Sequence, residues 1–217
     1  MRGVDPAKDQ SYFLYALGQT QLAHILFPLG GLTKHAVRDM ARRRALPSAA
    51  APESQDVCFI PGGDYRAFLR EVAPDLGLPG PIFDQAGRRL GEHPGLPGFT
   101  VGQRKGLGVS AAKPLYVLEI DGHRNALVVG PSDELLRQEC WIERVSFIAG
   151  RPPASAFTAE AQIRYGALPT RATVVLSSAT SARVQFASPQ RSVAPGQSLV
   201  LYDGDTVLGG GSIVSSC

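Results

Sequence analysis

The sequence predicts a multi-domain protein in which an α/β region is followed by mostly β structure. Helical spacing of apolar residues is clearest near the N-terminus, one helix and two hairpins follow, and the C-terminal part is a series of short strands. With 217 residues, 44% of them hydrophobic, the chain is long enough for more than one core. We therefore expect three regions, at residues 1–60, 61–135 and 136–217.

The first region is predicted to be helical. Residues 9–26 carry apolar side chains in a broken helical rhythm, which fits one or two short helices. A clearer helix follows, with Thr33 as its N-cap. A basic stripe lies on its outer face, at Lys34, Arg38 and Arg42. A solvated surface and a phosphate-contacting surface are equally compatible with that stripe.

Residues 61–135 are predicted to form a small mixed α+β domain. Asp64 fits the N-cap or first turn of a short amphipathic helix. A first hairpin is expected from Pro81 through a turn at 85–87, and a second has its strands over 114–120 and 125–129.

Residues 136–217 are predicted to form an antiparallel β-barrel, with a sandwich as the alternative. Alternation in the first strand places Tyr165 on the apolar face and Arg164 on the opposite face. Strands are expected over residues 157–165, 171–176, 182–186, 198–202 and 206–214.

Composition excludes several classes of protein. A net charge of +3 permits a polyanionic partner without requiring one. Three cysteines at unrelated spacings do not form the framework of a small secreted domain, so we expect a reducing cytoplasm and no metal site. No apolar run has the length of a membrane span and no signal peptide is evident, so a soluble protein with no membrane partner is expected.

Two short segments are candidates for chemistry. Cys58 lies between a polar turn and an apolar run, where it is either a lone nucleophile or a buried core residue. The run VGQRKGLG, residues 101–108, combines Arg104 and Lys105 with glycines on both sides, so it is either an exposed turn or a phosphate-binding loop. It is not a P-loop, because Lys105 precedes Gly106 instead of following it.

Four separated segments resemble one family, the tRNA-specific 2-thiouridylases (MnmA, also called TrmU). They are KDQSYFLY at residues 8–15, SQDVCFI at 54–60, TVGQRKGLG at 100–108, and PGQ at 195–197 with LGGG at 208–211. The resemblance extends from about residue 2 to the C-terminus. It implies that residues 1–60 are the C-terminal remnant of a PP-loop ATP-pyrophosphatase domain, with Met1 an internal or artificial start.

The resemblance also implies an activity, which is sulfur transfer to C2 of the wobble uridine of certain tRNAs. In that family ATP, with magnesium, adenylates the C2 oxygen, and a cysteine persulfide loaded by a sulfur-relay or cysteine-desulfurase protein delivers sulfur. Cys58 aligns with the persulfide carrier, and a thiolate suits that role because it is a good acceptor of sulfane sulfur. Residues that match tRNA-contacting positions are Lys8, Asp9, Gln10, Arg164, Tyr165 and Gln197, with Arg104 and Lys105 as further candidates.

The chain departs from the family pattern in one large respect. The SGGxDS phosphate loop that binds the nucleotide occurs nowhere in these residues. The acidic catalytic residue and the second cysteine, which would form a disulfide with the persulfide carrier, are also missing, because neither Cys140 nor Cys217 matches that cysteine.

Three functions therefore remain open. The chain is either part of a sulfurtransferase that acts when joined to the missing domain, or a tRNA-binding module without catalysis of its own. A cysteine hydrolase that uses Cys58 is a weaker alternative, because no histidine has a recognisable catalytic context. The histidines concerned are His24, His35, His93 and His123.

Overall fold

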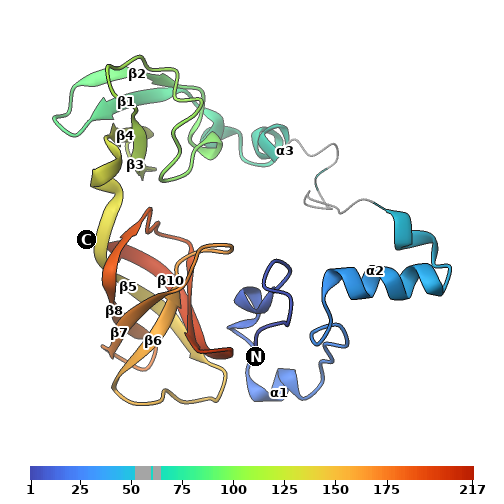
Figure 1. Cartoon of the computed structure of the whole chain (residues 1–217). Helices are drawn as coiled ribbons and strands as arrows, with labels where there is room; N and C mark the ends of the chain where they lie inside the picture. Colours follow the sequence, from blue (N-terminus) through green and yellow to red (C-terminus); the bar gives the residue numbers. More distant parts are fainter. Residues whose placement is uncertain (52–59, 61–64) are drawn as a thin grey trace. The chain divides into compact units, whose positions relative to one another are not determined.

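The computed structural model describes residues 1–51, 60 and 65–217, which divide into two compact units (Figure 1). One unit comprises Met1–Glu53, Arg137–Pro189 and Val193–Cys217, and the other comprises Ser54–Leu136 and Gln190–Ser192. Cys58 and Asp64, to which the sequence assigns roles, lie outside the described residues.

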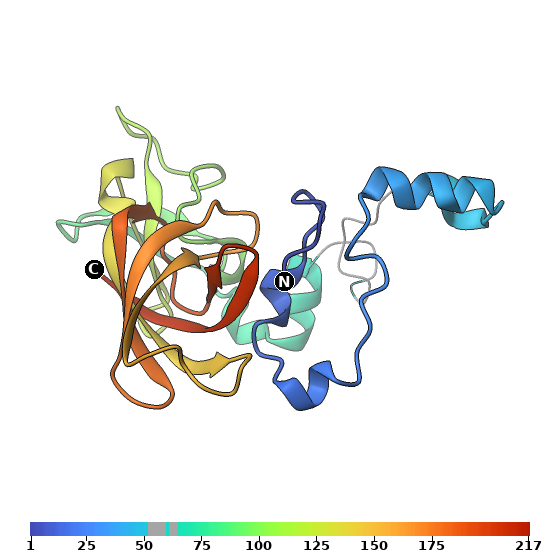
Figure 2. The same cartoon turned by 60° about the horizontal axis from the view of Figure 1, so that its bottom comes forward.

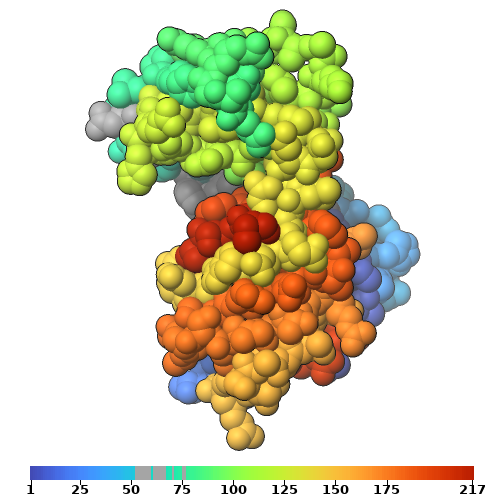
Figure 3. Space-filling model, turned by 90° about the vertical axis from the view of Figure 1, so that its left-hand side faces the viewer, coloured from blue at the N-terminus to red at the C-terminus, as the bar shows by residue number. Residues whose placement is uncertain are grey.

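The first unit contains a closed six-stranded barrel, as predicted (Figure 2). Its strand order is β10-β5-β8-β7-β6-β9. Figure 3 shows the end of β10 lying against β5, its antiparallel neighbour. The strands are β5 (Leu136–Phe147), β6 (Ala156–Gln162), β7 (Thr170–Leu176), β8 (Ser181–Arg191), β9 (Ser198–Asp203) and β10 (Thr206–Ser216).

The barrel is filled by inward-facing apolar side chains from all six strands. Ile142, Val184 and Leu201 are among the fully buried members of this core. Burial alternates along β7 and β8, since one face of each strand lines the interior and the other faces solvent. Closure leaves no free sheet edge among these strands.

Strand β5 is absent from the sequence-based prediction. Its alternation is interrupted at Glu143 and Arg144, which are both exposed, and Arg144 has a φ of 53°. The register with β10 shifts at the same place. A bulge of this kind places two successive residues on the outside and so hides the two-residue period.

The predicted end of β6 was wrong. The strand ends at Gln162, which is buried, whereas Tyr165 is 47% exposed instead of lying on the apolar face. The chain turns after Ile163, where Ala167 N donates to Arg164 O at 3.2 Å and Gly166 has a φ of 76°. The turn breaks the alternation on which the prediction for Tyr165 depended.

Residues 1–51 belong to the same unit as the barrel and contain the expected short helices. A 3₁₀ helix covers Ser11–Leu14, α1 covers Gln19–Leu22, and α2 covers Lys34–Arg43. The Thr33 hydroxyl accepts a hydrogen bond from Ala36 N at 3.2 Å, which confirms the predicted N-cap.

The second unit is a mixed α+β domain. It contains α3 (Tyr65–Val72) and a sheet of order β2-β1-β4-β3. Both predicted hairpins are confirmed, and β1 and β4 pair in parallel to join them. The strands are β1 (Gly80–Asp84), β2 (Arg89–His93), β3 (Tyr116–Asp121) and β4 (Ala126–Gly130).

Candidate nucleic-acid interface

Tyr12 connects three distant segments of the chain in the barrel unit. Its ring is 6% exposed, and its hydroxyl donates to Ser198 O at 2.7 Å. Its ring centroid lies 6.1 Å from that of Tyr165. Because Gln197 precedes Ser198, the segments that carry residues 8–10, 164–165 and 197 all meet around this one tyrosine.

The environment of Tyr12 keeps its hydroxyl protonated. Burial, followed by the neighbouring Tyr15 and Tyr202, raises the pKa of Tyr12 to about 12. A neutral phenol donates to the Ser198 carbonyl oxygen at physiological pH. Tyr15 adds a second connection, since its hydroxyl accepts from Ser198 Oγ at 3.1 Å.

An exposed aromatic pair covers Tyr12. The Phe13 and Tyr165 centroids are 4.8 Å apart with an interplanar angle of 37°, and the two residues are 57% and 47% exposed. Phe13 is missing from the site residues predicted from the sequence, because it looks like one of the apolar positions of the helical rhythm in residues 9–26. Its place beside Tyr12 in KDQSYFLY was the available signal.

Asp9 organises the segment that leads to Tyr12. Its Oδ1 accepts from Gly3 N at 2.9 Å and from Ser11 N at 3.0 Å, and its Oδ2 accepts from Ser11 Oγ at 2.8 Å. These bonds hold a sharp turn between two exposed side chains, Lys8 and Gln10. Asp9 therefore holds the backbone of this segment in position.

The other predicted contacts of this unit are exposed polar residues. Arg164 follows the last residues of β6, and Gln197 precedes β9. With Lys8 and Gln10, they add cationic and amide groups to the segments that meet at Tyr12. Such a combination suits RNA, because unpaired bases stack on aromatic rings and phosphates attract cations.

Arg104 and Lys105 belong to the other unit, and both are exposed. Their loop is held to β3, since Gly102 N donates to Val117 O at 2.7 Å and Val117 N donates to Gln103 O at 2.9 Å. It is therefore an ordered turn that presents two cations to solvent.

Neither of the two described thiols is suited to nucleophilic chemistry. Cys140 is fully buried in the barrel core, and burial raises its pKa to about 12. Cys217 is exposed, but desolvation and then a hydrogen bond from its Sγ to Glu139 Oε1, at 3.3 Å, raise its pKa. Both disfavour the reactive thiolate form.

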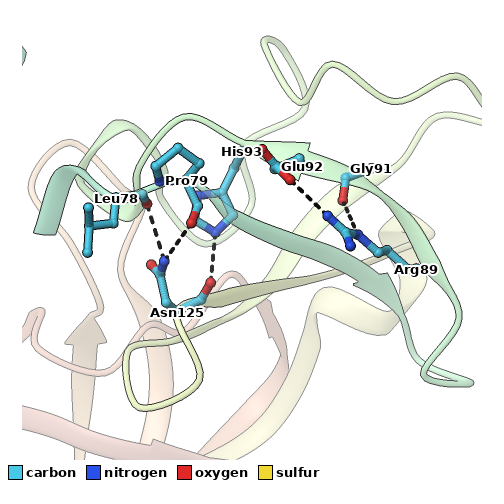
Figure 4. Close-up of polar contacts among 7 residues, drawn as sticks. All are labelled: Leu78, Pro79, Arg89, Gly91, Glu92, His93 and Asn125. Carbon is cyan, nitrogen blue, oxygen red and sulfur yellow. Dashed lines mark hydrogen bonds and ion pairs between the residues drawn. The ribbon is translucent and has the colours of Figure 1, made fainter.

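His93 is one of the histidines considered for a hydrolase, and its role is structural (Figure 4). It is 1% exposed, and its Nδ1 accepts from Gly95 N at 3.1 Å. Its Nε2 therefore carries the proton and donates to Asn125 O, also at 3.1 Å. The Asn125 side chain in turn donates to the carbonyl oxygens of Leu78 and Pro79. Both ring nitrogens are engaged, so His93 has none available as a general base.

Within residues 1–51 and 65–217, no helix has the length and apolar character needed to cross a membrane. In those same ranges, no cluster of three or more His, Cys, Asp or Glu side chains is arranged to bind a metal ion.

Three family models match successive parts of the chain. A tRNA methyl transferase HUP domain matches residues 1–62, a tRNA methyl transferase PRC-barrel domain matches 66–131, and an aminomethyltransferase beta-barrel domain matches 137–213. The fold therefore combines part of an α/β HUP domain, a PRC-barrel domain and a β-barrel.

Curated relatives give a more specific assignment. The chain is 52% identical to the tRNA-specific 2-thiouridylase MnmA of Roseiflexus sp. strain RS-1, over 98% of this chain and 57% of that protein. Proteins with the same name from Chloroflexus aggregans and Magnetococcus marinus are 50% and 48% identical, again over 98% of this chain. The chain is thus similar to tRNA-specific 2-thiouridylases along almost all of its own length, and it spans 57–60% of the length of these three relatives.

Proposed function

We propose that this chain supplies the tRNA-binding and sulfur-carrying parts of a tRNA wobble-uridine 2-thiouridylase. The single observation that best supports this function is the meeting of three predicted tRNA-contacting segments around Tyr12. They come from residues far apart in the sequence, yet they form one exposed surface. A chance resemblance in separate motifs would give no reason for such convergence.

In this proposal the surface around Tyr12 holds the tRNA. Arg164 and Lys8 meet phosphate oxygens, Gln10 and Gln197 contact ribose or base edges, and Tyr165 stacks on an unpaired base. Phe13 joins the set because it lies against Tyr165. Arg104 and Lys105 provide further contacts from the other unit.

Cys58 is proposed to carry the sulfur. A donor of the cysteine-desulfurase or sulfur-relay class would transfer its sulfane sulfur to the Cys58 thiolate, which leaves the donor as a thiol and Cys58 as a persulfide. The properties of Cys140 and Cys217 support this choice, since both have raised pKa values and one is fully buried.

Activation of the uridine is not assigned to these residues. ATP with magnesium serves that step in the proposed reaction, but the chain has no phosphate loop and its residues do not fit a nucleotide site. Polypeptide outside the 217 residues would supply it, together with the second cysteine.

We further propose that residues 1–60, 61–135 and 136–217 are the three domains and that the protein acts in the cytoplasm.

The proposed function is tested by tRNA binding to the purified chain at a series of salt concentrations. We expect the logarithm of the affinity to fall linearly with the logarithm of salt concentration, because phosphate contacts release counterions. A protein-free control and a double-stranded DNA of equal length would report non-specific binding. Binding that is absent at low salt, or equal for the DNA, would contradict the proposal.

The alternative of a tRNA-binding module without catalysis predicts the same binding result. It differs in sulfur chemistry, since such a module would not accept sulfur at Cys58. Persulfide loading of the chain therefore separates the two functions.

A further inference from the structure

Further basic residues lie in the second unit, near Tyr116, which is the first residue of β3. The Arg191 guanidinium carbon is 4.6 Å from the centroid of the Tyr116 ring. Arg191, which is the largest cause, and Arg104 lower the pKa of the Tyr116 phenol. Two guanidinium groups from distant segments therefore act on one phenol, and that of Arg191 lies over its ring.

The backbone fixes this convergence. The loop that carries Arg104 is joined to β3 by the two hydrogen bonds between residues 102–103 and Val117. The same loop packs against the residue that follows Arg191, since a Cβ on Gly102 would lie 2.2 Å from Ser192 Oγ. Ser192 N donates in turn to Leu135 O at 3.1 Å. Both arginines therefore lie on, or next to, backbone that hydrogen bonds hold in place.

The charge of the group is not compensated nearby. In the part of the chain that the structure describes, no carboxylate forms an ion pair with Arg104 or Arg191. By contrast, each arginine of this unit for which an ion pair is described lies within four residues of its acidic partner, as Arg88 does with Asp84. Two adjacent cations repel one another, so their convergence without a counterion indicates an anionic ligand.

Arg104 also faces a glycine-rich hollow, which Tyr116 and Arg191 do not line. Arg104 and Lys113 line an open hollow of about 450 Å³ together with the glycine-rich turn at Gly106–Leu107–Gly108. Guanidinium groups bind phosphate oxygens in a bidentate manner, and the phenol of Tyr116 can donate to a phosphate oxygen. Glycines allow the ligand to approach the backbone closely.

We propose that Arg104, Tyr116 and Arg191 form a phosphate site that binds a backbone phosphate of the tRNA. The inference rests on the proposed function and extends it, because nothing in the sequence pointed to Tyr116 or Arg191. A free phosphate, such as that of a small nucleotide, offers the same chemistry. The test must therefore separate the two sources.

The experiment measures tRNA affinity against salt for the full chain and four variants. Arg191→Gln and Arg104→Gln each remove one cation, and Arg191→Lys keeps the charge but loses the bidentate fork. Arg124→Gln removes an exposed arginine elsewhere in the unit that is paired with Asp121. We expect each of the first two to weaken binding roughly tenfold and to reduce the salt slope by about one contact. Arg191→Lys should retain the slope, and Arg124→Gln should change neither quantity.

The double variant Arg104→Gln/Arg191→Gln tests whether the two arginines share one phosphate. Groups that hold the same ligand are coupled, so the double loss should be smaller than the product of the single losses. Unchanged affinity and slope in both single variants, while Phe13→Ala weakens binding, would overturn this inference and leave the proposed function intact. A wild-type chain that does not bind tRNA would overturn both.

The source of the phosphate is tested with inorganic phosphate as the probe, by titration of the free chain. If Arg191→Gln abolished phosphate binding without changing tRNA affinity, the site would take a small free anion and the tRNA assignment would be wrong. Loss of tRNA affinity in that variant supports the assignment, and thermal unfolding of each variant verifies that it is folded.

Discussion

At the scale of single residues, the exposed face of Phe13 is the feature most open to test. Replacement by alanine should weaken tRNA binding by roughly 5- to 150-fold, since stacking of a base on an aromatic ring contributes about 1–3 kcal/mol. Thermal stability should change little because Phe13 is 57% exposed. Leu26→Ala, at a residue 90% exposed in the same unit, is the matched control and should leave tRNA affinity unchanged.

Titration of Tyr12 gives a second prediction at this scale. Its pKa is about 12 in the folded chain against an ordinary tyrosine value of 10.0, so the unfolded state loses its proton first as pH rises. The stabilising contribution of Tyr12 is therefore complete below pH 10 and is lost as pH approaches 12. The unfolding midpoint should fall more steeply across this window in the wild type than in Tyr12→Phe. Parallel pH profiles for the two proteins would contradict the account.

At the scale of elements, much of the architecture could be predicted because periodicity and turn chemistry agree locally. Thr33, the two hairpins and the barrel class are examples. Strand β5 was missed because its bulge at Arg144 disrupts the alternation, and the end of β6 was misplaced because a turn follows Ile163. Both errors come from local backbone geometry that a two-residue period cannot describe.

The convergence of segments around Tyr12 could not be read from the sequence. Residues 8–10, 164–165 and 197 were assigned by resemblance one segment at a time, and only the folded barrel brings them together. Phe13, Tyr116 and Arg191 were missed for the same reason, since their importance depends on contacts between distant segments.

Packing of the N-terminal segment on β10 gives a prediction at the element scale. A Cβ on Gly210 would lie 2.4 Å from Leu199 O and 2.8 Å from Tyr15 Cδ2. Gly210→Ala should therefore destabilise the barrel unit by about 1–3 kcal/mol through overpacking and should also weaken tRNA binding. Chemical denaturation measures the first effect and a binding titration the second. Gly31→Ala is the control, because nothing lies within 4 Å of its added Cβ, and it should leave the free energy of unfolding nearly unchanged. Equal losses of stability in the two variants would contradict this packing argument.

At the scale of the whole molecule, the chain spans 57% of the length of its Roseiflexus relative and has no phosphate loop in its sequence. We expect the purified chain to show no tRNA-dependent ATP turnover, because the backbone cradle for the nucleotide phosphates is missing. Chromatographic detection of AMP measures this, with the full-length Roseiflexus relative as the positive control. Release of AMP by the chain above the rate of a tRNA-free sample would show that its residues do form a nucleotide site.

The central claim is that this chain carries sulfur on Cys58, and the most direct measurement is peptide mass spectrometry after incubation with a cysteine desulfurase and L-cysteine. The account predicts one added sulfur on the peptide that contains Cys58, none on Cys140 or Cys217, and none on any peptide of the Cys58→Ser variant. Cys58 without added sulfur, while the desulfurase itself is loaded, would contradict the account and leave a tRNA-binding module as the remaining function.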